Sequence, residues 1–328
     1  MISKKIFLIP VRLLIGLMFL TTAILKLISI DQFEIYIYSF NIFSFGFTAI
    51  VARLLIFLEF LLGSFLIFKI QYKKIWWLTL LIMIGFTLFL IYVALFRNDT
   101  NCHCFGEFIE LNPTHSIIKN LITILLLFIV KNETENDYKG KKIFLWGIPA
   151  LSFLVTFIIF PPDSLYNQFR SEQNNFDTEF FKKLPADTSL YSVINNIEYL
   201  NENDTVIFSD KKEIVQLDSG KYIMVFMTSG CKYCKISLTK LNSIFEKHNL
   251  NNDRCIIWIW GRDTSSISRF IKTTGGLSFK YNIIDPYAAI DLVFGHFPTF
   301  VIIDNNKVVK VLDYRGLSEN ELKEYFAQ

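Results

Sequence analysis

The sequence predicts a two-part protein, an α-helical transmembrane bundle of four to five spans followed by an α/β domain. The 328 residues are 52% hydrophobic with a mean hydropathy of +0.38, which is too apolar for a soluble globular protein. Long apolar runs fill the first half. The second half is more polar and alternates short apolar runs with helical patterns, as an α/β domain does.

Five apolar runs are candidate spans, because a helix needs about 20 apolar residues to cross a bilayer. The runs are Ile6–Ile28, Phe45–Phe68, Ile75–Phe96, Ile117–Val130 and Ile143–Phe160. The fourth is short, so the expected number of spans is four or five. The first is interpreted as an uncleaved anchor, since it is too long for a signal peptide and contains Arg12 and Lys26.

The distribution of lysine and arginine predicts the orientation of these spans. Basic residues gather at the N-terminus and in the loops after the second and fourth runs, whereas the loop 31–44 has none and the loop 97–116 has Arg97 alone. We therefore expect a multi-pass protein of the inner (cytoplasmic) membrane with a cytoplasmic N-terminus. The loop 97–116 and residues 161–328 then lie on the oxidising, extracytoplasmic side.

Ionisable residues inside spans are costly and mark functional positions. Arg12, Lys26 and Lys119 lie near span ends, where long cationic side chains can extend to the interface. Glu59 lies mid-span and needs a partner, for which Lys26 and Arg53 are the candidates. The group is either a structural pair or a site for a proton or a quinone head group, so Glu59, Lys26 and Arg53 are the predicted cofactor-binding residues.

One cysteine pair, Cys102 and Cys104, lies in the loop before the fourth run. A disulfide between residues two apart closes a strained ring, which would make it an oxidant. The alternatives are a purely structural disulfide and a copper or zinc site with His103 and His115 as further ligands. The redox interpretation is favoured, because the spacing of these ligands matches no common zinc finger, and no metal site is predicted.

The membrane half resembles the DoxX/MauE superfamily of small four-helix membrane proteins over about residues 6–132. The matching pieces are Arg12-Leu-Leu-Ile-Gly16 followed by Lys26, Leu58-Glu59 followed by Gly63, and Cys102-His-Cys-Phe-Gly106. The last is the most specific, because MauE-like members carry a Cys-x-Cys-Phe-Gly loop. The resemblance implies a redox-associated or quinone-linked role. The fifth span is an addition that would export the C-terminal part.

The second cysteine pair, Cys231 and Cys234, lies between a strand-like run, Tyr222–Met227, and a helical pattern, Ile236–Lys247. A helix N-terminus directs unpaired backbone N–H groups and a positive dipole end at the first cysteine. This favours the thiolate, which is the nucleophile in disulfide exchange. Lys232 and Lys235 beside the pair either add to this effect or are solvated surface residues.

Periodicity and turn residues predict the remaining elements of the second half. They are a span end at Pro161-Pro162, a polar linker at Ser164–Lys183, a hairpin of Thr205–Phe208 with Glu213–Leu217, a buried strand at Cys255–Trp260, a helix at Ser265–Thr274, a strand at Tyr281–Ile284, a helical turn at Ala288–Phe294, a hairpin of Phe300–Ile303 with Val308–Leu312, and a helix at Ser318–Phe326. Cys255 stands alone and is expected to be a small buried hydrophobe.

This order of elements resembles the thioredoxin fold, and within it the TlpA/ResA-like extracytoplasmic branch, over about residues 185–328. The resemblance rests on Cys231-Lys-Tyr-Cys234 and on Gly295-His-Phe-Pro298-Thr299-Phe300, with Ile303-Asp304 before the hairpin turn. It implies that Cys231 attacks, that Cys234 resolves and that Pro298 follows a cis peptide bond beside the disulfide. The chain departs from thioredoxin at Val225, which replaces a buried aspartate.

The predicted domains are a membrane bundle at 1–132, a cytoplasmic loop and fifth span at 133–162, a linker at 163–185 and an extracytoplasmic thioredoxin-like domain at 186–328. We expect a membrane-anchored thiol–disulfide oxidoreductase with Cys231, Cys234, Pro298, Cys102 and Cys104 as catalytic residues. The first pair would exchange with extracytoplasmic client proteins, and the loop pair would pass electrons to a quinone, with no covalently bound cofactor.

Net oxidation of clients is favoured, because no cysteine lies within a span or on the inner side to carry electrons outward. Two alternatives stay open: a tethered disulfide reductase fed by a separate partner, and a metal-handling or assembly module with a thioredoxin-like binding domain. The bilayer is an expected partner. Nucleic acid is not, since the net charge is only +3 and no basic stripe is found.

Overall fold

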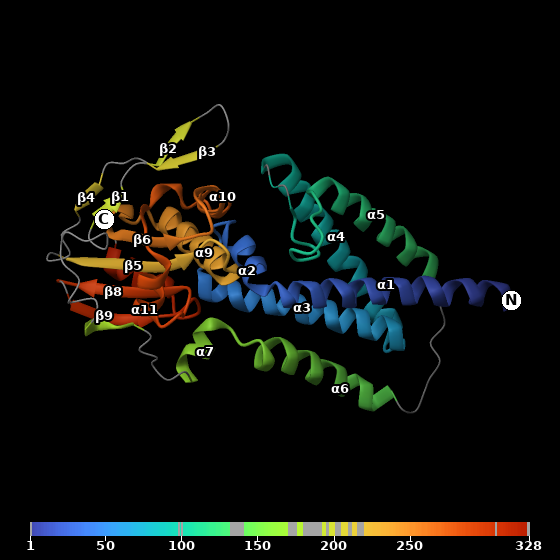
Figure 1. The fold of residues 1–328 in the computed structure, drawn as a ribbon. Coiled ribbons are helices and arrows are strands. Elements are labelled where there is room, and N and C mark those ends of the chain that lie inside the picture. Colours follow the sequence, from blue (N-terminus) through green and yellow to red (C-terminus); the bar gives the residue numbers. More distant parts are fainter. Residues whose placement is uncertain are drawn as a thin grey trace. The chain divides into compact units, whose positions relative to one another are not determined.

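The computed structural model describes residues 2–97, 99, 101–131, 141–169, 176–179, 192–194, 197–200, 205–208, 212–214, 220–305 and 307–326. The chain separates into two compact units, Met1–Pro162 and Asp163–Gln328 (Figure 1). Each unit is described by itself below. The predicted combination of a helical membrane bundle and an α/β domain is confirmed.

Four helices of the first unit are long and apolar enough to cross a membrane. They are α1 (Ile2–Ile28, with its apolar part at Leu8–Ile28), α3 (Phe45–Phe68), α4 (Tyr72–Phe96) and α5 (Pro113–Val130). Helix α6 (Lys141–Phe153) continues into the π-helical turn η1 (Leu154–Ile159) and contributes to a bent helix pair that can count as a fifth span. The chain is therefore a multi-pass membrane protein with the predicted four to five spans.

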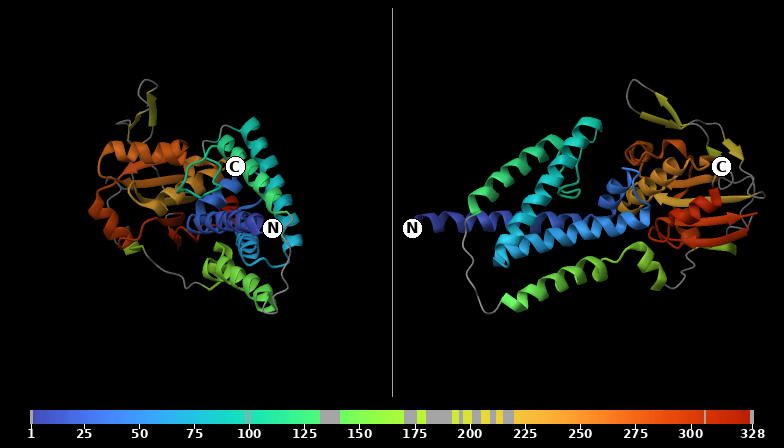
Figure 2. Two further views of the ribbon diagram at one scale, coloured as in Figure 1. Left: turned by 90° about the vertical axis from the view of Figure 1, so that its right-hand side faces the viewer. Right: turned by 180° about the vertical axis from the view of Figure 1, so that it is seen from behind.

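Helices α1 and α3 run side by side (Figures 1 and 2). Gly16 and Gly63 meet where the helices pack: a Cβ on Gly16 would lie 2.9 Å from the carbonyl oxygen of Gly63, and one on Gly63 would lie 2.7 Å from that of Gly16. Close backbone approach at small residues is a main source of helix association in membranes. Both glycines of the predicted motifs are therefore required by helix packing.

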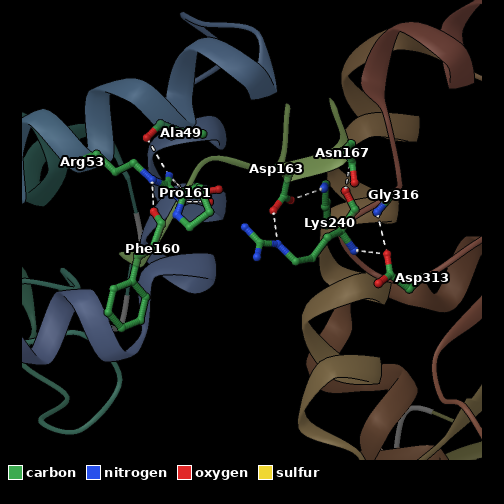
Figure 3. A network of polar contacts seen from close by, with 11 residues as sticks. Ala49, Arg53, Phe160, Pro161, Asp163, Asn167, Lys240, Asp313 and Gly316 are labelled. Carbon is green, nitrogen blue, oxygen red and sulfur yellow. Dashed lines mark hydrogen bonds and ion pairs between the residues drawn. The ribbon is translucent and has the colours of Figure 1, made fainter. Parts of the chain in front are cut away.

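A short helix, α2 (Ile30–Tyr38), occupies the region that the sequence-based prediction treats as a loop. Its buried Glu34 forms an ion pair with Arg53 of α3. The Arg53 guanidinium also donates to the carbonyl oxygens of Phe160 at 2.8 Å and Pro161 at 3.0 Å (Figure 3). Arg53 thus joins α2 and α3 to the chain segment that follows η1.

The second unit is built on a seven-stranded mixed sheet with the order β4-β1-β7-β6-β5-β8-β9 (Figure 1). The strands are β1 (Ser192–Ile194), β4 (Lys212–Ile214), β5 (Lys221–Thr228), β6 (Cys255–Trp260), β7 (Lys280–Ile283), β8 (Thr299–Asp304) and β9 (Lys307–Leu312). Strands β5, β6 and β7 are parallel, β8 pairs antiparallel with β5, and β9 pairs antiparallel with β8. The predicted strands before the Cys231 motif and after it are confirmed.

One predicted hairpin is wrong. Strand β3 (Thr205–Phe208) pairs with β2 (Ile197–Leu200) in a separate two-stranded sheet, whereas β4 pairs with β1 in the main sheet. The turn-like segment between β3 and β4 is typical of a hairpin by local sequence alone. The true partners are β1 and β2, which the sequence analysis did not identify as strands.

Helices cover the sheet of the second unit. They are α9 (Lys232–His248), α10 (Thr264–Thr274), α11 (Pro286–Val293) and α12 (Glu319–Phe326), which confirms the predicted helices. Met224 and Trp258 of the sheet pack in one cluster with Leu292 of α11. Phe245 of α9 contacts Phe326 of α12 at a ring-centroid distance of 6.1 Å. Cys255 is fully buried, as predicted, and burial raises the pKa of its thiol.

The described part of the predicted linker is packed onto the second unit. It contains α7 (Asp163–Phe169), whose Asp163 accepts hydrogen bonds from Lys240 of α9 at 3.2 Å and from Arg315 at 2.8 Å (Figure 3). Phe176 is buried against Phe226 of β5. Polar composition predicts a linker with short helical pieces here, and α7 is such a piece; Asp163 and Phe176 attach these segments to the domain.

Candidate functional site

The first candidate site lies where β5 ends and α9 begins. Cys231 is the N-cap of α9, and its Sγ accepts a hydrogen bond from the backbone N–H of Cys234 at 3.2 Å. Cys231 is half-buried, whereas Cys234 is fully buried. This arrangement exposes one sulfur to a reaction partner and keeps the second behind it.

The two thiols of this site differ in acidity. The hydrogen bond with the Cys234 thiol, helped by the backbone N–H groups of Cys234 and Tyr233 and opposed by burial, lowers the pKa of Cys231 to about 6. Burial raises the pKa of Cys234. Lys232 and Lys235 are exposed and are not among the groups that lower the pKa of Cys231. Cys231 is therefore the thiolate at neutral pH.

The peptide bond between Phe297 and Pro298 is cis, as the motif predicts. It precedes β8, and the carbonyl oxygen of Phe297 lies 3.8 Å from Cys231 Sγ. Val225, at the position of the thioredoxin aspartate, is fully buried, so no carboxylate from this position reaches Cys234.

The second candidate site is the loop that carries Cys102 and Cys104. The Sγ of Cys102 lies 2.9 Å from the hydroxyl of Ser116 on α5, and the backbone N–H of Cys104 donates to it at 3.4 Å. Gly106 has φ +65°, and a Cβ there would lie 2.2 Å from Ser29 Oγ. Only glycine lets the loop approach α1 this closely, which explains the last position of the Cys-x-Cys-Phe-Gly motif.

The loop thiols are also unequal. Hydrogen bonds with Cys104 and Ser116, with the charge of Lys119, lower the pKa of Cys102 against the opposing effect of burial. The hydrogen bond with Cys102, followed by burial, raises the pKa of Cys104. Cys102 is buried, whereas Cys104 is half-buried. The more acidic thiol is thus the less accessible one, the reverse of the order in the first site.

Both loop thiols line a cavity of about 340 Å³ inside the first unit. Its walls are mostly aromatic and aliphatic side chains, joined by Lys26, Glu59 and Lys119. Lys26 is 5% exposed and forms a buried ion pair with Glu59 Oε1, so the interpretation that it extends to the interface is wrong. The other oxygen, Glu59 Oε2, is buried without a hydrogen-bond partner among the described residues.

Two of the three predicted cofactor-binding residues therefore share a cavity with the loop thiols. Arg53 is not among the residues that line it, because its guanidinium is engaged by Glu34 and two backbone carbonyls. The sequence analysis missed Tyr36, which lines the cavity and whose buried hydroxyl has no partner among the described residues. Helical spacing of the lining residues Phe33, Tyr36, Ile37 and Phe40 is the signal that identifies it.

A metal site at the loop finds no support in the structure. Among the described residues, no group of three or more His, Cys, Asp or Glu side chains could hold a metal ion. The His103 ring instead lies 4.7 Å from the Tyr36 ring, centroid to centroid, and burial lowers the pKa of His103. The His103 imidazole is therefore an aromatic group packed against the Tyr36 ring.

Comparison with known proteins finds similarity in both units. Residues 4–131 match the family model of methylamine utilisation protein MauE, which accounts for less than half of the chain. A protein of Flavobacterium psychrophilum named TlpB is 27% identical over 308 residues, an alignment that covers 84% of this chain and 82% of the relative. The similarity to TlpB therefore extends across both units. The DoxX part of the predicted resemblance is not shown by these matches.

Solved structures with similarity cover only part of this chain. StoA from Bacillus subtilis is 19% identical, with 38% of this chain and 90% of that chain covered at a TM-score of 0.27. The thioredoxin domain of a thiol-disulfide oxidoreductase from Bacteroides vulgatus is 13% identical, with 41% and 92% covered at a TM-score of 0.26.

Proposed function

We propose that this chain is a membrane-anchored thiol–disulfide oxidoreductase that oxidises extracytoplasmic client thiols and passes the electrons to a quinone. The observation that carries the proposal is the cavity, because both loop thiols line an apolar space among the membrane-spanning helices. The charge distribution of the loops supports a cytoplasmic N-terminus, with both cysteine pairs on the opposite side. The match to MauE over the membrane unit agrees with this assignment.

Client oxidation begins at the oxidised first pair. A client thiolate attacks the sulfur of the half-buried Cys231, which breaks the disulfide and leaves Cys234 reduced. A second client thiol then attacks the client sulfur of the mixed disulfide and releases Cys231. The low pKa of Cys231, about 6, makes it a good leaving thiolate. The client gains a disulfide, and two electrons and two protons reside on Cys231 and Cys234.

The loop pair then reoxidises the first pair. The Cys231 thiolate attacks the half-buried Cys104 sulfur of a Cys102–Cys104 disulfide, and Cys102 departs as the thiolate. Cys102 is the better leaving group because its pKa is lowered, whereas that of Cys104 is raised. Cys234 then attacks Cys231, which restores the first disulfide and leaves Cys102 and Cys104 reduced.

The cavity residues fit a quinone head group. A quinone bound there would accept the two electrons and two protons of the reduced loop pair. The volume of about 340 Å³ lies within the range of small-molecule sites. Burial raises the pKa of Tyr36, so its unpartnered hydroxyl stays protonated and can donate a hydrogen bond to a carbonyl oxygen. The ion pair with Lys26 compensates the charge of the buried Glu59 carboxylate.

Thiol trapping in native membranes tests the relay. The variant Cys234→Ala cannot resolve a mixed disulfide, so we expect Cys231 to accumulate in a covalent link to the 97–116 loop, identified by mass spectrometry of the joined peptides. The link should be absent from both Cys234→Ala/Cys102→Ala and Cys234→Ala/Cys104→Ala, because either change removes the loop disulfide that Cys231 attacks. Capture of Cys231 only on other proteins would refute the internal relay. The variant Cys255→Ala, which alters a buried thiol outside both pairs, is the control.

A further inference from the structure

A second, smaller pocket adjoins the cavity of the loop thiols. Its volume is about 200 Å³, and it lies between α3 and α4. Its lining residues are Leu55, Leu58, Glu59, Leu62, Ile82, Gly85 and Phe86. Leu55, Glu59 and Phe86 line both spaces, so the pocket and the cavity share a wall. The apolar pocket therefore lies directly beside the cavity, at Leu55, Glu59 and Phe86.

The two spaces differ in chemistry. The cavity has the thiols of Cys102 and Cys104 and the Tyr36 hydroxyl in its lining. Glu59 is the one polar side chain in the lining of the pocket. It is 4% exposed, its Oε1 is bound by Lys26, and its Oε2 has no partner among the described residues. The boundary between the polar and the apolar space thus carries a buried carboxylate with one oxygen that has no partner among the described residues.

The pocket lies at the depth of lipid tails. Gly85 precedes Phe96, the last residue of α4, by 11 residues, which is about 16 Å along the helix axis. Leu58 follows Phe45, the first residue of α3, by 13 residues, or about 20 Å. These values are about one half and about two thirds of the roughly 30 Å hydrocarbon thickness, so both residues lie well inside it. The exposed Leu81, Ile84 and Leu88 flank Gly85 on α4, as expected for a lipid-facing surface.

We infer that the cavity binds a lipid quinone with its head group at the Cys102 loop and its isoprenoid tail leaving the bundle between α3 and α4, past Phe86 and Gly85. This inference rests on the proposed function and adds the entry route and the ligand class, a membrane quinone with a long tail. A head group alone needs only the cavity. A tail adds apolar burial in the pocket, so affinity should rise with tail length.

The variant Gly85→Leu tests the route. A Cβ at Gly85 meets nothing within 4 Å, so a leucine fills open space without displacing the backbone. Gly46, near the start of α3, is equally open and lines neither space, which makes Gly46→Leu the matched control. Binding of a tailless benzoquinone and of a long-tailed quinone to the purified full chain in detergent is measured by equilibrium dialysis, alongside oxidation of the loop thiols.

We expect Gly85→Leu to raise the dissociation constant of the long-tailed quinone by about tenfold or more and that of the tailless one by less than about twofold. Gly46→Leu should change neither. An equal effect of Gly85→Leu on both quinones, or no effect on either, would overturn the tail route. Absence of binding of both quinones to the unaltered chain would refute the proposed function instead.

Photolabelling provides a test that needs no variant. A quinone with a photoreactive group at the tail end should label peptides that contain Leu55–Leu62 or Ile82–Phe86. Labelling confined to α1 or α5 would overturn the tail route while leaving quinone binding intact.

Discussion

Each of the two cysteine pairs contains one thiol of low pKa and one of high pKa, but different neighbouring groups cause this difference in the two pairs. In each pair one thiol has a lowered pKa and the other a raised one. At Cys231, the backbone N–H groups at the start of α9 add to the effect of the Cys234 thiol in lowering the pKa. At Cys102, which belongs to a loop, the hydroxyl of Ser116, the backbone N–H of Cys104 and the charge of Lys119 add to the effect of the Cys104 thiol. Asymmetry between two thiols is therefore set by local hydrogen bonds and not by one particular fold.

The two pairs differ in whether the thiol of low pKa is the accessible one. The acidic thiol Cys231 is the accessible member of its pair, which suits attack on other proteins. The acidic thiol Cys102 is buried and lines an apolar cavity, which suits reaction with a small molecule and departure as a leaving group. The comparison predicts that each pair can be disabled without disabling the other.

The largest expected effect is this separation. Cys231→Ala should abolish disulfide exchange with a reduced model client while quinone still oxidises Cys102 and Cys104. Cys104→Ala should do the reverse, leaving one round of client oxidation and no further turnover. Gel-shift alkylation of each pair in membranes measures both outcomes. Loss of both reactions in either single variant would contradict the division of labour, and Cys255→Ala controls for the loss of a thiol.

The next effect concerns acidity at the helix start. With a pKa of about 6, Cys231 is a thiolate above pH 6, and its alkylation rate should fall as pH drops through 6. Cys234→Ala removes the largest cause of the low pKa, so the midpoint of the rate profile should move to higher pH. Cys234→Ser keeps a donor and should move it less.

The profile is measured by iodoacetamide labelling in a background with Cys102 and Cys104 replaced by alanine. An unchanged midpoint in Cys234→Ala would show that the helix N-terminus alone sets the acidity.

A smaller effect is expected at Ser116. Ser116→Ala removes the hydroxyl 2.9 Å from Cys102 Sγ and should raise the pKa of Cys102. The net contribution of a typical hydrogen bond, about 0.5–1.5 kcal/mol, corresponds to a fall of about twofold to tenfold in the rate at which quinone oxidises the loop pair near neutral pH. Thr123→Val removes a buried hydroxyl on the same helix, outside the cavity lining, and should leave this rate unchanged. Equal rates in both variants would argue against a role for the hydroxyl.

Much of this organisation follows from local sequence patterns. Runs of apolar residues identify the spans, and the position of Cys231 between a strand-like run and a helical run places it at a helix start. The close approaches at Gly16, Gly63 and Gly106 are not visible in the sequence, although the motifs that contain them are. Such contacts depend on which helices pack together.

Contacts between residues far apart in the sequence are what the local patterns do not predict. The sequence offers Lys26 and Arg53 as equally suitable partners for the buried Glu59. Glu59 pairs with Lys26, because Arg53 forms its ion pair with Glu34, a residue in helix α2, which the sequence does not predict. Because helix α2 is not predicted, Tyr36 is not among the residues predicted for the candidate site. Strand partners of β3 and β4 were misassigned for the same reason, since pairing is decided by elements distant along the chain.

The smallest expected effect tests whether surface charge contributes to the first site. Lys232 and Lys235 are exposed, and an exposed charge acts through water of high dielectric constant. The Cys231 pKa is lowered by the Cys234 thiol and by backbone N–H groups, so Lys232→Gln/Lys235→Gln should change the iodoacetamide rate at pH 7 by less than about twofold and should not add salt dependence. A midpoint that rises in this variant, and rises less in high salt, would show that the two pairs both rely on a nearby cation and would remove the distinction drawn between them.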